Sequence, residues 1–198
     1  MNVFEEVADP RVAAMLRSGG IGVIPTDTVY GIVASARRPD AIERLYRVRQ
    51  RDAHKACIVL VGSRSQIDDT AAWQPIDWHV TKRYWPGPVS IVVPTTNMTP
   101  AYLFHGDQSP PYRLPDDPQL RVLLNRVGPL VAPSANLQGE PPATTVEQAQ
   151  AYFGESVDFY VDGGELHNQP STLITTQSGK VTIIRQGAGV IGPEDLSR

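Results

Sequence analysis

Hydroxyl, amide and guanidinium side chains gather in three short segments, each beside an apolar run typical of a strand. The first segment is PTDTVYG at 25–31, where two threonine hydroxyls and a phenol flank a tight turn. Gly31 would permit a close approach of backbone to a ligand. Taken alone, this segment is better explained as an ordinary capped turn.

The second segment is basic and comprises Arg49-Gln50-Arg51 and Lys55. The spacing of Ile42, Leu45 and Arg49 places the arginine on the apolar face of a predicted helix. An arginine directed inward needs an anion, because an unpaired buried charge is costly. A triphosphate is one candidate for that anion, and the carboxylate of Glu43 is the structural alternative.

The third segment is Val131-Ala132-Pro133-Ser134-Ala135-Asn136, an apolar strand that ends in a Ser-x-Asn pair. Serine and asparagine side chains can donate hydrogen bonds to phosphate oxygens or to an adenine edge. They can equally satisfy the backbone of a local turn. Each of the three segments is therefore a weak signal by itself.

Several common site types are excluded by the sequence. It contains no GxxxxGK[ST] loop, GxGxxG turn, GxSxG elbow or HExxH pair. No histidine lies at metal-ligand spacing with another histidine or with the single cysteine, Cys57, so no metal ligands are expected from protein side chains. Cys57 lies in an apolar run and is predicted to be a core residue. No stretch is long enough to span a membrane and no leader is recognised, so we expect a cytoplasmic protein.

The elements that must position these groups follow from hydrophobic periodicity and capping residues. The first predicted helix starts after Asp9, with Pro10 at its first position, and stops at Gly19-Gly20. Residues 94–118 are rich in proline and are predicted to form a long surface loop. A hairpin is expected around Gln177-Ser178-Gly179. Further helices are predicted at 40–50, 78–85, 118–127 and 146–153, the last with a Thr145-x-x-Gln148 capping box, and strands at 21–24, 29–34, 57–61, 89–93, 130–132, 157–161, 172–176 and 181–185.

Length and composition suit one compact α/β domain over residues 1–198, with a mixed sheet because strands and helices interleave irregularly. The formal net charge of −3 argues against wholesale coating of nucleic acid. Only three of the 18 basic residues are lysines, and the arginine excess suits bidentate phosphate or carboxylate contacts.

In this order, the segments resemble the YrdC-like threonylcarbamoyl-adenylate synthase family from about residue 21 to residue 187. The quoted pieces are PTDTVYG at 25–31, RQR with Lys55, YWPGPVSIVVP at 84–94, YRLPDDP at 112–118, APSANLQGEPPATT at 132–145, VDGG at 161–164, ST at 171–172 and RQG at 185–187. The chain departs from the family where Arg49 replaces a lysine, Asp52 a proline and Leu60 a histidine seen in some members. The resemblance implies a twisted mixed sheet curled around a deep, basic, concave cavity.

The resemblance also implies a division of the cavity between two substrates. It assigns L-threonine to Thr26, Thr28, Tyr30, Arg113 (on the carboxylate) and Ser171. It assigns ATP to Arg49, Arg51, Lys55, Ser134, Asn136, Thr144 and Arg185, with Arg49 and Arg51 positioning the phosphates. No classical general base is expected, and Mg²⁺ would accompany the nucleotide.

The implied reaction joins L-threonine, bicarbonate and ATP into threonylcarbamoyl-AMP, which a separate transferase would use to modify transfer RNA. Three alternatives stay open. The chain could be a noncatalytic protein that binds double-stranded RNA or tRNA through its arginine-rich 37–51 segment. It could be a divergent paralogue that adenylates another substrate, given the departures at Arg49 and Asp52. It could also be a carbamoyl-adenylating module of the kind found in hydrogenase maturation, although the accessory zinc-finger and acylphosphatase segments are not recognised in this sequence.

Overall fold

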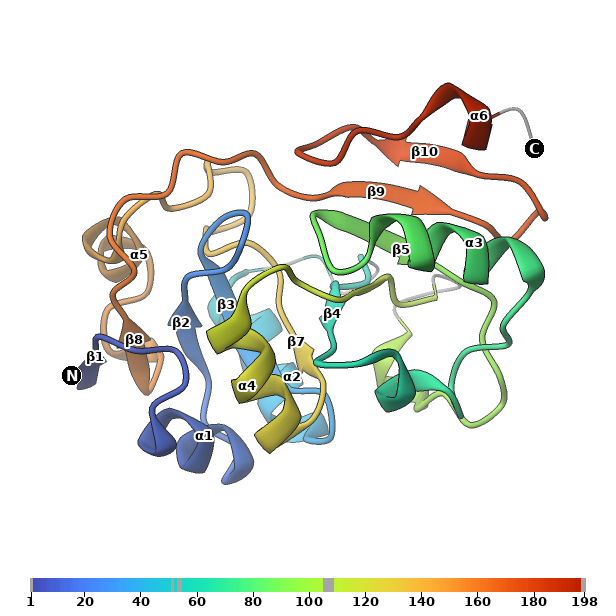
Figure 1. The fold of residues 1–198 in the computed structure, drawn as a ribbon. Coiled ribbons are helices and arrows are strands. Elements are labelled where there is room, and N and C mark those ends of the chain that lie inside the picture. Colours follow the sequence, from blue (N-terminus) through green and yellow to red (C-terminus); the bar gives the residue numbers. More distant parts are fainter. Residues whose placement is uncertain (1, 51, 53–54, 105–108, 197–198) are drawn as a thin grey trace.

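The computed structural model describes residues 2–50, 52, 55–104 and 109–196. Its described strands form one mixed sheet in the order β1-β8-β2-β3-β7-β4-β6-β5-β9-β10 (Figure 1). The strands are β1 (Asn2–Phe4), β2 (Gly22–Ile24), β3 (Gly31–Ser35), β4 (Val59–Leu60), β5 (Val89–Val92), β6 (Tyr112–Arg113), β7 (Leu130–Val131), β8 (Phe159–Val161), β9 (Thr172–Thr175) and β10 (Thr182–Arg185). The helices are α1 (Pro10–Arg17), α2 (Pro39–Val48), α3 (Pro75–Tyr84), α4 (Pro118–Val127), α5 (Val146–Phe153) and α6 (Pro193–Leu196), with short 3₁₀ turns at Arg64–Ile67, Ala101–Leu103 and Gly154–Ser156.

The sheet is mixed, as the sequence predicts. β8 pairs in parallel with both β1 and β2, whereas β2 and β3 are antiparallel. Side chains alternate between the two faces of each strand. Along β3, Ile32 and Ala34 therefore join an apolar cluster with α2 and α5, and Val33 joins a second cluster with α1 and α4. None of the described helices is long and apolar enough to cross a membrane.

Capping chemistry fixes most helix starts. Five of the described helices begin with proline, namely Pro10, Pro39, Pro75, Pro118 and Pro193. Proline suits this position because the N–H groups of the first turn have no acceptor within the helix. The predicted N-cap is confirmed, since the Asp9 carboxylate accepts from the Arg11 backbone N–H at 2.7 Å. The predicted helices at 118–127 and 146–153 and the β9–β10 hairpin are also confirmed. Cys57 is buried in the core, as expected.

The prediction for residues 94–118 is partly wrong. This stretch contains β6, whose two buried residues pair with β4 on one side and β5 on the other, in the interior of the sheet. A strand of two residues, flanked by prolines at 110–111 and 115, is too short to show a hydrophobic period, so the sequence carries no local signal for it. The short strand β1 was missed for the same reason. Only one half of the expected capping box forms at α5, because the Gln148 Oε1 atom accepts from the Thr144 N–H, one residue before the N-cap.

A buried carboxylate fastens α6 to α3. Asp195 is fully buried and accepts from Tyr84 OH at 2.5 Å and Arg83 Nε at 3.1 Å, and its Oδ1 lies 2.6 Å from His79 Nε2. Burial acts to raise the pKa of Asp195, but the hydrogen bonds from Tyr84 and His79 and the charge of Arg83 outweigh it and lower that pKa. The carboxylate therefore stabilises the fold at neutral pH.

We expect Asp195→Ala to lower the free energy of unfolding by about 1–3 kcal/mol at pH 7, because it leaves buried donors without their acceptor. A group whose pKa is depressed in the folded state contributes stability above its unfolded pKa, and that contribution is lost as the pH falls. The difference between wild type and variant in thermal unfolding should therefore shrink below about pH 4. A difference that stays constant well below that pH would contradict the assignment. Glu194→Ala, at an exposed neighbour, is the control and should change little.

Candidate functional site

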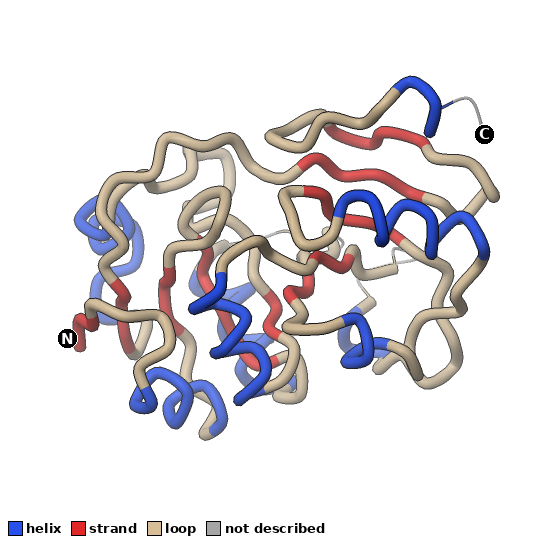
Figure 2. Tube along the Cα trace, in the orientation of Figure 1, coloured by secondary structure: helices blue, strands red, loops and turns tan. Residues whose placement is uncertain are grey.

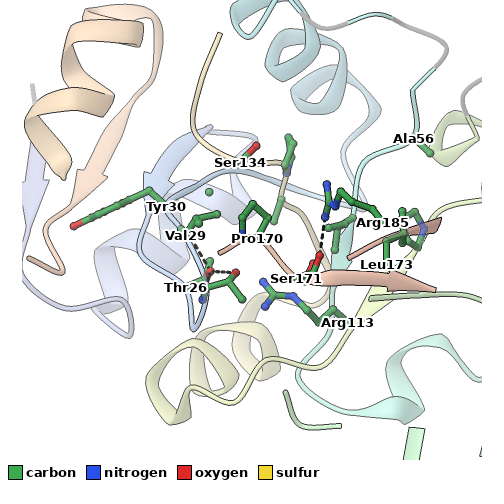
Figure 3. Close-up of a pocket in the computed structure, with 16 residues that line it drawn as sticks. Thr26, Val29, Tyr30, Ala56, Arg113, Ser134, Pro170, Ser171, Leu173 and Arg185 are labelled. Carbon is green, nitrogen blue, oxygen red and sulfur yellow. Dashed lines mark hydrogen bonds between the residues drawn. The ribbon is translucent and has the colours of Figure 1, made fainter. Parts of the chain in front are cut away.

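A cavity of about 140 Å³ lies where the loops that leave β2 and β7 meet the chain that enters β9 (Figure 3). Between β8 and β9 the chain is loop throughout and passes over the sheet (Figure 2). That loop supplies Pro170 and Ser171 to the cavity wall. The remaining lining residues are Thr26, Thr28, Val29, Tyr30, Gly31, Ala56, Ile58, Pro111, Arg113, Ala132, Pro133, Ser134, Leu173 and Arg185.

The first and third segments of the sequence lie side by side in this wall. The Ile32 N–H donates to Pro133 O at 3.0 Å, and the Ala135 N–H donates to Tyr30 O at 2.7 Å. These backbone hydrogen bonds extend the β3–β7 pairing beyond the strand ends. The hydroxyls of the PTDTVYG turn and the Ser-x-Asn pair therefore belong to one site.

Arg49 joins the second segment to the third. It follows α2 as the C-cap residue and is 4% exposed. Its Nε donates to Ser134 O at 2.8 Å, and its Nη2 donates to Ser134 Oγ at 3.0 Å and Asn136 Oδ1 at 2.8 Å. The structural alternative, Glu43, pairs instead with exposed Arg47 at 3.1 Å. Arg49 thus fixes the Ser-x-Asn turn at the cavity edge.

Asn136 is held by more contacts than Ser134. Its Nδ2 donates to Leu137 O at 2.8 Å and to Glu140 O at 2.7 Å, so the amide shapes the loop after β7. Ser134 is only partly buried and lines the cavity directly. The two residues of the pair therefore differ in how far they can turn toward a ligand.

Arg113 forms a buried ion pair with Asp27. Its Nη1 lies 2.7 Å from Asp27 Oδ1, and the two side chains are 4% and 8% exposed. Burial lowers the pKa of Arg113, Asp27 acts in the opposite direction, and the charge of nearby Arg185 lowers it further. The buried Arg113 Nε has no hydrogen-bond partner among the described residues. This arginine therefore reaches the cavity with donors still to be satisfied.

Arg185 and Ser171 form the part of the cavity wall that comes from β10 and from the chain entering β9. Arg185 Nη2 donates to Ser171 O at 2.9 Å (Figure 3). The Ser171 and Ser90 hydroxyls lie 2.8 Å apart. The described lining residues include two arginines, Arg113 and Arg185, and no carboxylate. Such a cavity is suited to an anionic ligand.

The three side-chain hydroxyls of the PTDTVYG turn point in different directions. Thr26 Oγ1 lies 3.0 Å from Thr28 Oγ1 and donates to Val29 O at 2.7 Å. In Figure 3 the Tyr30 phenol points away from these threonines. Its hydroxyl donates to Gly164 O and accepts from the Gly163 N–H. Tyr30 therefore ties the VDGG loop to the cavity wall.

Four of the sequence-predicted site residues that the structure describes do not line the cavity, namely Arg49, Lys55, Asn136 and Thr144. Arg51 lies outside the described residues. Lys55 is exposed, and its carbonyl accepts from Tyr46 OH at 3.0 Å. Thr144 Oγ1 donates to Gln148 at 3.2 Å, and Asn136 stands behind Ser134.

The structure also places Gly31, Leu60 and Asp52, which the sequence singled out. A Cβ added at Gly31 would lie 3.5 Å from Pro133 O, which is ordinary contact, so crowding does not require glycine there. Leu60 is fully buried in the apolar cluster with α1 and α4, so this departure from the family falls in the core. Asp52 donates its backbone N–H to Gln138 Oε1 at 2.6 Å, which links the basic segment to the loop after Asn136.

Sequence reasoning missed Asp27 as a member of the site. It lies inside the quoted PTDTVYG segment, yet its partner Arg113 is 86 residues away. A carboxylate between two threonines also suits an ordinary turn, so the local pattern did not single it out.

The family resemblance implies that Ser134 binds ATP. On that assignment, we expect Ser134→Ala to weaken ATP binding by about threefold to tenfold, because a neutral hydroxyl hydrogen bond contributes about 0.5–1.5 kcal/mol. Its thermal stability should stay near that of wild type, since Ser134 keeps its backbone contact to Arg49. Titration calorimetry with a nonhydrolysable ATP analogue measures this effect. Asn136→Ala should instead lower the melting temperature, because it removes the two hydrogen bonds that shape the loop. Unchanged nucleotide binding by Ser134→Ala would remove Ser134 from the nucleotide site.

The comparisons agree on one family. A family model described as "Telomere recombination" and named Sua5_yciO_yrdC matches residues 14–187. The threonylcarbamoyl-AMP synthase of Thiobacillus denitrificans is 34% identical over 179 residues, which cover 89% of this chain and 95% of that protein. The threonylcarbamoyl-AMP synthase of Pyrococcus abyssi is 28% identical over 193 residues, which cover 94% of this chain and 57% of that protein.

A solved structure supports the same fold. The crystal structure of P. abyssi Sua5 complexed with L-threonine matches with a TM-score of 0.85 at 27% identity, over 94% of this chain and 57% of that chain. The present chain thus spans little more than half of the Pyrococcus protein but nearly all of the Thiobacillus protein.

Proposed function

The chain belongs to the Sua5/YciO/YrdC family, and from that premise we propose that it makes threonylcarbamoyl-AMP and pyrophosphate from L-threonine, bicarbonate and ATP. The observation that carries the proposal is the cavity wall, where Arg113 and Arg185 lie beside the Thr26 and Thr28 hydroxyls and no described lining residue is a carboxylate. Curated relatives named threonylcarbamoyl-AMP synthase, and a relative complexed with L-threonine, support it.

We assign L-threonine to the side of the cavity formed by Arg113. A guanidinium group binds a carboxylate through parallel N–H bonds. Arg113 lines the cavity, and its buried Nε has no hydrogen-bond partner among the described residues. The hydroxyls of Thr26, Thr28 and Ser171 can meet the amine and hydroxyl of the amino acid. Tyr30 supports this side by holding the VDGG loop.

We assign the nucleotide to the side formed by Ser134. Arg49, which holds Ser134 and Asn136, would set the donors that face phosphate oxygens, and Arg185 would contact the ribose-phosphate region. Arg51, Lys55 and Thr144 complete the proposed set. The arrangement is suited to positioning two substrates and to stabilising charge on a departing pyrophosphate.

In the proposed reaction, the threonine amine combines with bicarbonate to give a carbamate and water. A carbamate oxygen then forms a bond to the α-phosphorus of ATP, and the bond to pyrophosphate breaks. No general base among the cavity residues is required, since their role is to align the reactants. Arginines and hydroxyls can do this without changing protonation state.

Mg²⁺ fits this site only as a companion of the nucleotide. The cation prefers carboxylate, phosphate and water oxygens. The described lining residues offer no carboxylate, and Asp27 behind them is paired with Arg113. Phosphate oxygens and water would therefore hold the ion, which would neutralise charge on the leaving group.

The surface arginines favour this enzyme over a noncatalytic RNA-binding protein. In the 37–51 segment, Arg38 pairs with Asp40, Arg44 with Asp158 and Arg47 with Glu43. Carboxylates that already neutralise these arginines reduce their attraction for phosphates. We propose that the product passes to a separate tRNA-modifying transferase and that any contact with tRNA is secondary.

Pyrophosphate release tests the proposal against its alternatives. Purified protein with ATP, Mg²⁺ and bicarbonate should release pyrophosphate when L-threonine is added, and not with other amino acids or with carbamoyl phosphate. Pyrophosphate release that requires carbamoyl phosphate would favour the hydrogenase-maturation type of module. Pyrophosphate release with another amino acid would favour a divergent paralogue. Salt-sensitive RNA binding without any pyrophosphate release would favour the RNA-binding reading.

A further inference from the structure

Asp27 uses both of its carboxylate oxygens to join three segments of the chain. Oδ1 accepts from Arg113 Nη1 at 2.7 Å, and Oδ2 accepts from the Asp116 backbone N–H at 3.0 Å. The carboxylate thus fixes the PTDTVYG turn to β6 and to the loop that leads into α4. Because both oxygens are engaged and the side chain is 8% exposed, the carboxylate has little freedom to move.

The contact with Asp27 occupies only one end of the Arg113 guanidinium group. Within the described part of the chain, neither Nε nor Nη2 donates a hydrogen bond, and Nε is buried. These two N–H groups form the side-on edge that binds a carboxylate through two parallel bonds. A buried donor without a partner costs about 1–3 kcal/mol, so this edge gains from a ligand that supplies acceptors.

The chemistry of this edge points to a carboxylate. A carboxylate supplies two acceptor oxygens in one plane, which match two parallel N–H donors of a guanidinium group. A compact carboxylate such as that of an α-amino acid therefore fits the open edge of Arg113.

We propose that Asp27 is a positioning residue that holds the Nε–Nη2 edge of Arg113 toward the cavity to receive the carboxylate of the amino-acid substrate. This inference rests on the proposed function, because it takes that amino acid to be L-threonine. Asp27 does not touch the substrate itself. It acts through the orientation of Arg113.

The test is Asp27→Asn, which keeps the shape of the side chain and removes its charge. Threonine affinity, measured by titration calorimetry without ATP, should fall about tenfold or more. The KM for threonine should rise in parallel, while the KM for ATP stays within about threefold of wild type. Equal losses for both substrates, unchanged threonine affinity, or tighter threonine binding would each overturn the proposal.

A second variant keeps the test decisive if Asp27→Asn does not fold, since a lost partner leaves a buried charge unpaired. Asp27→Glu retains the charge and should fold, but its extra methylene displaces the guanidinium. It should show a smaller, threonine-specific loss, and wild-type affinity in this variant would also overturn the proposal.

Asp158→Asn is the matched control. Asp158 forms an ion pair of 2.7 Å with Arg44 and does not line the cavity, so this variant should leave both KM values unchanged. A loss of threonine affinity in this control equal to that in Asp27→Asn would overturn the proposal. Measurements on the wild-type protein separate failure of the proposed function from failure of the role proposed for Asp27. If it binds no threonine and releases no pyrophosphate, the proposed function itself fails, whereas an active wild type with a normal Asp27→Asn variant defeats only the role of Asp27.

Discussion

Replacing Arg113 with alanine is expected to lower kcat/KM for threonine by about 100-fold or more, with the KM for ATP changed by less than about threefold. Hydrogen bonds to charged groups contribute about 1.5–3 kcal/mol each, and the proposed carboxylate contact uses two of them. Arg113→Lys keeps the charge but loses the planar fork, so its loss should be intermediate. Initial rates of pyrophosphate release, measured while each substrate is varied in turn, separate the two KM values.

Stability must be controlled in this experiment. Arg113→Ala leaves Asp27 as an unpaired buried carboxylate, which is expected to cost about 3–5 kcal/mol. The double variant Arg113→Ala with Asp27→Ala removes both charges and should recover much of that loss, yet still bind threonine poorly. Arg44→Ala serves as a matched arginine control outside the cavity. Equal effects of Arg113→Ala on threonine and ATP would contradict the assignment of its carboxylate contact.

The second large effect is expected at Arg49, on the nucleotide side. Arg49→Ala removes three hydrogen bonds that hold Ser134 and Asn136, so the KM for ATP should rise by about tenfold or more, with a smaller change for threonine. Arg49→Lys should lose less, because an ammonium group can still donate to part of the same set of oxygens.

Arg47→Ala is the control for this effect, since Arg47 is exposed and paired with Glu43 one helical turn away. Its kinetics should match wild type. If Arg49→Ala raised the KM for threonine more than the KM for ATP, the division of the cavity proposed above would be wrong. A melting curve for each variant separates disordered protein from a specific loss of nucleotide binding.

Most helices and strands could be predicted from local patterns in the sequence. The boundaries of α4 and α5 could be predicted because proline, aspartate and threonine act within one turn of the helix they start. β6 could not, because a strand of two residues has no measurable period and is specified by its neighbours β4 and β5. The most informative strand for the site was therefore the one with the weakest pattern.

Contacts between residues far apart in the sequence limit how much of the site could be predicted from the sequence. The cavity brings together Thr26, Ser134 and Arg113, which the sequence had grouped only through the family resemblance. The contacts that orient them, Arg49 with Ser134 and Arg113 with Asp27, join residues 85 and 86 positions apart. No spacing rule predicts such pairs, because they depend on how separate strands register in the sheet.

The central claim is that this cavity joins threonine, bicarbonate and ATP into one product. The most direct measurement incubates the purified protein with ATP, Mg²⁺, L-threonine and ¹³C-bicarbonate and follows the adenylate by mass spectrometry. The account predicts a threonine-containing adenylate that carries the ¹³C label, appears together with pyrophosphate and is greatly reduced in Arg113→Ala. A folded wild-type protein that binds ATP and threonine yet forms no labelled adenylate would contradict it.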